Sequence, residues 1–78
     1  MPVTEARMRL RDRTWLEKAR RLKGRTQDEV AEAAGCSVTF YNRIERGLQM
    51  PNVDIALRIC QFLEVDAYEF LREKTLAR

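Results

Sequence analysis

The stretch between Thr39 and Arg46 carries the side chains with the most definite chemistry in this sequence. If successive residues of a helix turn by about 100°, one threonine, one asparagine and two arginines of this stretch share a face. Tyr41 and Ile44 then fall on an opposite, apolar face. A hydroxyl with a methyl group, a carboxamide and guanidinium groups are suited to contact base edges and phosphates in a DNA major groove. The pattern indicates a nucleic-acid contact made by Thr39, Asn42, Arg43 and Arg46.

Sequence signals for helix starts and ends show which elements must position this face. Thr26 and Glu29 form a capping box, which predicts a helix that begins at Gln27. Gly35 can adopt the left-handed conformation that ends this helix, and Ser37 can cap the next one. The connection is then only about three residues long, so the two helices must cross steeply.

These residues resemble a known family, the phage-repressor and Cro-like helix-turn-helix regulators, often called the XRE family. The resemblance covers about residues 14 to 71 and is carried by TQDEVA, the GCS turn, IERG, Pro51 and LEVDAYEFL. It implies an all-α, lambda-repressor-like fold of five helices, with helices two and three as the helix-turn-helix. It also implies sequence-specific binding of double-stranded DNA by a small transcriptional regulator, a repressor of bacterial or phage type.

The resemblance assigns expected roles to individual residues. Gln27 matches the position that grips a phosphate, and Phe40 and Arg46 match flanking positions that meet the backbone, although Phe40 is equally suited to border the core. The loop containing Gln49 matches one whose backbone amides face a phosphate. Arg20 and Glu45 match a partly buried ion pair that ties the first helix to the second helix of the motif. The positions that face bases or the groove are Ser37, Val38, Thr39, Asn42 and Arg43.

Two further helices are expected on the N-terminal side and in the centre of the fold. A capping box of Thr14 and Glu17 predicts a first helix from about Trp15 to Lys23. Its buried stripe is expected to be Trp15, Leu16, Ala19 and Leu22. Asn52 is expected to cap a fourth helix over 53–63, with an inward stripe of Val53, Ala56, Leu57, Ile59, Cys60 and Leu63.

A fifth helix should follow a capping box of Asp66 and Glu69. Ala67, Phe70 and Leu71 would face inward. Glu64 stands where the family prefers glycine, which predicts a strained turn before this helix.

Apolar side chains that point away from the expected core predict a homodimer that binds a two-fold operator. They are expensive to leave in water together on so small a protein, unless residues 72–78 cover them in a monomer. The expected interface residues are Ile55, Phe62 and Tyr68.

The segments outside 14–71 are expected to be a basic arm, 1–13, and a short C-terminal extension, 72–78. Arginines alternate at positions 7, 9, 11 and 13. This alternation fits an extended arm that lies along phosphates or enters a minor groove. The alternative is a flexible or packed terminus, and Met8 and Leu10 favour a packed strand.

The composition of the 78 residues excludes several classes of function. Without histidine, and with only Cys36 and Cys60 as thiols, the chain offers no metal site and no nucleophile with its base. Both cysteines are interpreted as reduced core thiols. No catalytic residue, cofactor or small-molecule ligand is therefore expected. The absence of a long apolar run or signal peptide predicts no membrane contact and a cytoplasmic, nucleoid-associated protein.

Charge is unevenly distributed, since residues 1–25 hold nine Lys or Arg against three Asp or Glu. The net charge of these residues is +6, whereas the net charge of the whole chain is +3. Residues 26–78 therefore carry a net charge of −3. Bulk charge therefore does not suffice for DNA binding. Two alternatives stay open: an antitoxin or adaptor whose main role is to bind a protein partner, and a helical bundle that binds no nucleic acid.

Overall fold

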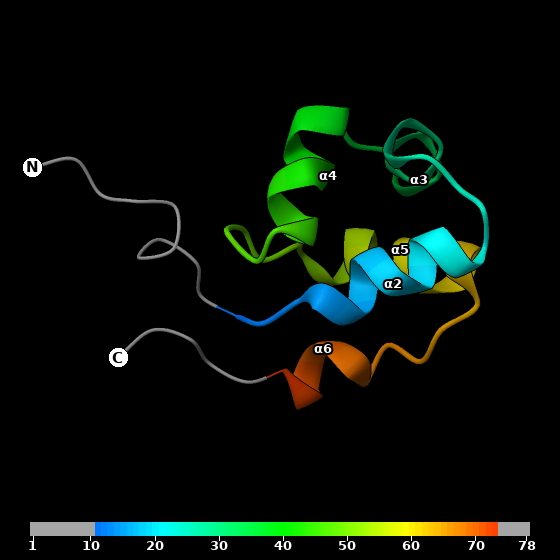
Figure 1. Ribbon diagram of the computed structural model, residues 1–78. Helices are drawn as coiled ribbons and strands as arrows, with labels where there is room; N and C mark the ends of the chain where they lie inside the picture. Colours follow the sequence, from blue (N-terminus) through cyan, green and yellow to red (C-terminus); the bar gives the residue numbers. More distant parts are fainter. Residues whose placement is uncertain (1–10, 74–78) are drawn as a thin grey trace, which may run out of the picture.

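The computed structural model describes residues 11–73, which form five helices. They are α2 (Thr14–Leu22), α3 (Gln27–Ala34), α4 (Val38–Glu45), α5 (Val53–Leu63) and α6 (Glu69–Arg72). In Figure 1, α4 stands across the direction of α2, while α6 lies below α2. Helix α3 packs against both α5 and α4. No helix within 11–73 has the length and apolar character needed to cross a membrane.

The helix-turn-helix segment forms as the local signals predict. Both hydrogen bonds of the capping box are present, with Glu29 N donating to Thr26 Oγ1 at 3.1 Å and Thr26 N donating to Glu29 Oε1 at 2.9 Å. Gly35 ends α3 in the left-handed region at φ 78°, a conformation that costs glycine little. Ser37 Oγ then accepts from Phe40 N at 3.0 Å and caps α4. Local chemistry therefore fixes the short connection between the two helices.

The core is built from side chains of all five helices. Trp15 of α2 packs edge-on against Phe70 of α6 at 5.0 Å between ring centroids, which joins the two ends of the domain. The central cluster of buried apolar residues is formed by Leu16, Val30, Ala31, Ala34, Tyr41, Ile44, Ile59, Cys60, Leu63 and Phe70.

Helix α5 has the predicted bounds and the predicted Asn52 cap, and Ile59, Cys60 and Leu63 are buried as predicted, but another part of its predicted inward face is wrong. Ile55 and Phe62 are half-buried and pack against the core. Val53 and Leu57, expected inside, are 74% and 52% exposed. The helix is apolar around more than half its circumference, so periodicity alone could not choose its orientation.

Both terminal helices differ from their predicted starts. Thr14 lies inside α2, where its hydroxyl donates to Asp12 at 3.0 Å, so no capping box with Glu17 forms. Asp66 accepts from Tyr68 N at 2.9 Å in a turn, and α6 begins without a side-chain cap. These short polar side chains bond to backbone and side-chain groups close by in the sequence, an arrangement that competes with a cap.

Two leucines expected inside, Leu22 and Leu71, are instead 79% and 75% exposed. Tyr68 is exposed, as predicted.

The expected basic arm of residues 1–13 does not extend as far as Arg13. Arg13 is buried, with its guanidinium inside the domain. The other arginines of the alternation, apart from Arg11, lie outside the described residues, as do Met8 and Leu10. The interpretation of Arg13 as a phosphate-binding arm residue is therefore wrong.

Both thiols are free. Cys60 is buried, and burial is the main reason that its pKa rises to about 11. Cys36, predicted to be a core residue, is only half-buried, and burial raises its pKa as well.

Glu64 occupies the left-handed region at φ 58°, alone among the non-glycine residues of 11–73. It ends α5 at the position where the sequence predicted strain. Its side chain forms an exposed ion pair with Lys23 at 2.7 Å. Exposed pairs of this kind contribute little, so the backbone conformation dominates the effect of substitution.

We expect Glu64→Gly to raise the midpoint of thermal unfolding by about 5 °C, because glycine removes the left-handed strain. Glu64→Ala is the matched control, since it removes the same ion pair but keeps a Cβ. Thermal unfolding followed by circular dichroism should rank the glycine variant above both the wild type and the alanine variant. Equal midpoints for glycine and alanine would show that the turn is unstrained.

Candidate nucleic-acid interface

Helix α4 has one face fixed in the core and another facing outward. Tyr41 and Ile44 are fully buried, while Thr39 and Val38 are exposed. Phe40 is half-buried and packs against the core, which favours its role as a border residue. The helix therefore presents a polar surface from a fixed position.

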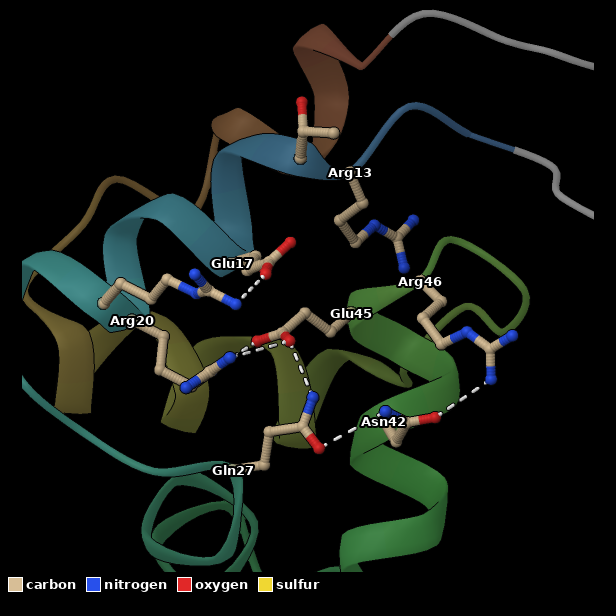
Figure 2. A pocket seen from close by; sticks show the side chains of 9 residues that line it. Arg13, Glu17, Arg20, Gln27, Asn42, Glu45 and Arg46 are labelled. Carbon is tan, nitrogen blue, oxygen red and sulfur yellow. Dashed lines mark hydrogen bonds and ion pairs between the residues drawn. The ribbon is translucent and has the colours of Figure 1, made fainter.

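Glu45 lies at the end of α4, and its carboxylate is the meeting point of three helices. It accepts hydrogen bonds from Arg20 of α2, with Nε to Oε2 at 2.7 Å and Nη2 to Oε1 at 3.2 Å. Gln27 at the start of α3 donates from Nε2 to Oε1 at 2.7 Å. The Tyr41 hydroxyl donates to Oε2 at 2.9 Å. The ion pair predicted from Arg20 and Glu45 is thus present, within a larger network (Figure 2).

The protonation of this network follows from its hydrogen bonds. Burial on its own raises the pKa of Glu45, but donation from Arg20, Gln27 and Tyr41 outweighs it and holds the pKa below the usual value. Burial, reinforced by the charge of Glu45, raises the pKa of Tyr41, so its hydroxyl stays a donor. Glu45 is therefore a carboxylate at neutral pH.

The network continues outward to two more of the predicted DNA-binding residues. Asn42 Nδ2 donates to Gln27 Oε1 at 3.3 Å, and Arg46 Nη1 donates to Asn42 Oδ1 at 3.2 Å. Figure 2 shows Gln27 and Asn42 as a bridge between Glu45 and Arg46. The carboxamides of both residues are thus engaged within the protein.

A hollow of about 260 Å³ opens beside this bridge, between α2, the start of α3 and α4. Four arginines line it, and two carboxylates compensate part of their charge. One of these, Glu17, forms an ion pair with Arg21 at 2.7 Å. The lining residues are Arg13, Thr14, Glu17, Arg20, Arg21, Gln27, Asn42, Glu45 and Arg46.

The remaining predicted contact residues fall into two groups. Val38, Thr39 and Arg43 make no side-chain hydrogen bond or ion pair with any residue of 11–73. Ser37 and Gln49 are used internally: the Ser37 hydroxyl caps α4, and the Gln49 backbone carbonyl accepts from Arg13 Nη1 at 2.8 Å.

Sequence reasoning missed Arg13 and Glu73, whose side chains are wholly buried around the end of α4. No local signal marks them, because the partners are separated by 60 positions in the chain.

A helix-turn-helix family model matches residues 16–70, which is most of the chain. The chain belongs to the phage-repressor and Cro-like helix-turn-helix family. Among the relatives of this helix-turn-helix protein is YqaF of Bacillus subtilis, an uncharacterised HTH-type transcriptional regulator. The two are 43% identical over 54 residues, which cover 69% of this chain and 71% of YqaF.

Solved helix-turn-helix structures share the fold. The N-terminal DNA-binding domain of SinR from Bacillus subtilis superposes with a TM-score of 0.68 at 31% identity, covering 78% of this chain and 90% of that one. A crystal structure of SinR, the master regulator for biofilm formation, in complex with DNA superposes with a TM-score of 0.66 at 29% identity. It covers 74% of this chain and 94% of that one.

We expect Glu45→Gln to lower the free energy of unfolding by about 1.5–3 kcal/mol near neutral pH, because it removes charge-assisted hydrogen bonds. The folded-state pKa of Glu45 is depressed. Its contribution is therefore fully present above the unfolded-state pKa and is lost as pH falls through the folded-state pKa. The difference between wild type and variant should shrink in urea titrations taken from about pH 7 to about pH 3.

Glu32→Gln, at an exposed glutamate of α3, is the control and should show little effect at either pH. A Glu45→Gln deficit that stays constant over the whole pH range would contradict an ionised Glu45 in the folded state.

Proposed function

We propose that this protein is a transcriptional regulator that binds double-stranded DNA sequence-specifically, with α4 in the major groove. The family supports DNA-binding regulation, and the related SinR has been solved in complex with DNA. YqaF carries the name of a transcriptional regulator.

The observation that carries this proposal is that the two faces of α4 differ in their contacts. Its inner face is held by the buried Glu45 network, and its outer face leaves Val38, Thr39 and Arg43 without internal polar partners in 11–73. Such a helix can enter a groove without first breaking bonds made by these three side chains. We assign base reading to them, with Arg43 spanning guanine O6 and N7 and Val38 contacting a thymine methyl.

Gln27, Asn42 and Arg46 are assigned to positioning and phosphate contact. Gln27 stands at the start of α3, where free backbone N–H groups and the helix dipole attract a phosphate. Its carboxamide donates one N–H to Glu45 and accepts from Asn42, which leaves the second N–H for a phosphate. Asn42 is held on both sides, which favours a supporting role over base reading.

Four arginines, Arg46 among them, line a hollow beside Gln27. This placement supports phosphate contact along one groove edge by a protein with a net charge of only +3. The loop after α4, which includes Gln49, follows this same end of the helix and supplies backbone amides for a second phosphate contact.

We further propose that the protein binds a two-fold operator as a homodimer and acts as a repressor. Val53 and Leu57 lie one turn apart on α5 and are exposed, as are Tyr68 and Leu71. They replace Ile55 and Phe62 as interface candidates, since those two pack against the core. Exposed apolar side chains of this size favour contact with a second copy.

We expect Arg43→Ala to cost about 1–3 kcal/mol on the best operator and to flatten the preference at one base pair per half-site. Gln27→Ala should weaken all sequences by a similar factor, since every sequence offers a phosphate. The measurement is a binding titration against a duplex selected from a random pool and against its single-base variants.

Salt dependence provides the control for this assignment. Loss of a phosphate contact in Arg46→Ala should lower the slope of log affinity against log salt by about one unit, whereas Gln27→Ala should leave it unchanged. If Arg43→Ala weakened binding to every duplex variant equally while Gln27→Ala changed the preferred base, the assignment of base reading to Arg43 and of phosphate contact to Gln27 would be wrong. A selection that enriches no motif would refute sequence-specific binding.

We expect two chains per operator duplex, with half-sites about ten base pairs apart from centre to centre. Leu57→Glu should abolish the two-chain complex, because it places a charge in the apolar contact. Leu22→Glu makes the same change at an exposed leucine outside the proposed interface and should preserve that complex. Sedimentation of each variant with the selected operator tests this, and one chain per asymmetric site would contradict the dimer.

A further inference from the structure

Arg13, just before α2, and Glu73, just after α6, form an ion pair inside the protein. Arg13 Nε lies 2.6 Å from Glu73 Oε2, and Nη2 lies 2.8 Å from Oε1, so the pairing is bidentate. Both side chains are 0% exposed. Trp15 Nε1 also donates to Glu73 Oε2 at 2.6 Å. Both partners lie outside residues 16–70, the part of the chain that the family model matches.

The rest of the Arg13 guanidinium is directed at the end of α4 and the loop that follows. Nη1 donates to the carbonyl of Ile44 at 3.0 Å and to that of Gln49 at 2.8 Å. Nη2 contacts Met50 Sδ at 2.9 Å, and the group lies over the Phe70 ring at 5.1 Å. The five N–H donors of a guanidinium are thus all accounted for.

The two carbonyls that Arg13 joins lie on either side of the turn after α4. Within this turn, Gly47 has φ 76° and donates to Ile44 O at 3.0 Å, and Leu48 N donates to Arg43 O at 2.9 Å. Arg13 closes the turn from outside by holding Gln49 next to Ile44. Its own orientation is set by Glu73, because a buried guanidinium cannot go without a counter-charge.

We infer that Glu73 and Arg13 are positioning residues that preorganise the loop of residues 46–50, so that DNA affinity depends on a carboxylate at the end of α6. This inference rests on the proposed DNA-binding function, in which that loop supplies amides to a phosphate. Fixing the loop before binding avoids the entropic cost of ordering it on DNA. Glu73, which follows α6, is thereby coupled to the DNA-binding surface without contacting DNA.

The test is Glu73→Gln, which keeps the size of the side chain but removes the charge. Affinity for the selected operator should fall by about tenfold, a typical value for coupled sites, and the preferred sequence should stay the same. Amide hydrogen exchange at Gly47 and Leu48, whose N–H groups donate to Ile44 O and Arg43 O, should accelerate, while the buried helical amides of α3 and α5 stay protected. Glu69→Gln is the matched control, because Glu69 pairs with Arg72 on the exposed side of α6 at 2.9 Å.

A second variant separates loop positioning from stability. Arg13→Met combined with Glu73→Leu replaces the ion pair with apolar side chains, an exchange that is often neutral or stabilising. This double variant should fold, including under conditions where Glu73→Gln does not. It should still bind DNA about tenfold more weakly, because nothing joins the carbonyls of Ile44 and Gln49.

Wild-type affinity and unchanged exchange at Gly47 and Leu48 in either folded variant would overturn the inference. If the wild-type protein itself enriched no sequence and bound no duplex, the proposed function would fail instead. The two failures are therefore distinguishable in the same set of titrations.

Discussion

The structure depends on one buried carboxylate, that of Glu45. It takes hydrogen bonds from α2, from the start of α3 and from its own helix, through Arg20, Gln27 and Tyr41. Removing a carboxylate from water is unfavourable, and only a nearly complete set of donors compensates for it. The three helices must therefore keep one relative arrangement for Glu45 to remain ionised. That requirement holds α4 at a defined angle to the rest of the domain.

A second buried carboxylate acts, through Arg13, on the same end of α4. Glu73 orients Arg13, and Arg13 holds the carbonyls of Ile44 and Gln49. Helix α4 is thus fixed by two carboxylates. Glu45 belongs to the helix-turn-helix itself, and Glu73, after the last helix, acts through Arg13, before the first. Polar groups with full sets of partners specify a geometry more narrowly than apolar packing does, because any displacement leaves a donor or acceptor unsatisfied.

This arrangement bears directly on how the proposed DNA surface works. The side chains assigned to base reading have no internal polar partners in residues 11–73, whereas Gln27 and Asn42 are connected to the buried network. A side chain that reads bases must be able to form new hydrogen bonds with DNA, whereas the residues that position it must already be hydrogen-bonded within the protein. Loss of this support would weaken DNA binding even where the base-reading side chains themselves are intact. The exposed apolar residues of α5 belong to a different surface, which is suited to a second copy of the chain.

Much of the fold follows from the sequence by itself. The Thr26–Glu29 capping box, Gly35, the Ser37 cap and the Asn52 cap act within a few residues of their own positions. Their effects need no knowledge of distant contacts, so the bounds of α3 and α5 and the turn between α3 and α4 were predictable. The Arg20–Glu45 pair came from the family resemblance, which carries tertiary information that periodicity lacks.

Only the tertiary structure decided the orientation of α5 and the role of Arg13. A helix that is apolar around most of its surface has several orientations with similar burial, and the packing of α3 against it selects one, with Ile55 and Phe62 inward. Arg13 and Glu73 meet across 60 positions, and nothing near either residue distinguishes them from the exposed charges of α2 and α6. Local sequence patterns reflect interactions between residues that are close in the chain. A buried ion pair between distant residues forms only once the folded chain has excluded water from around it.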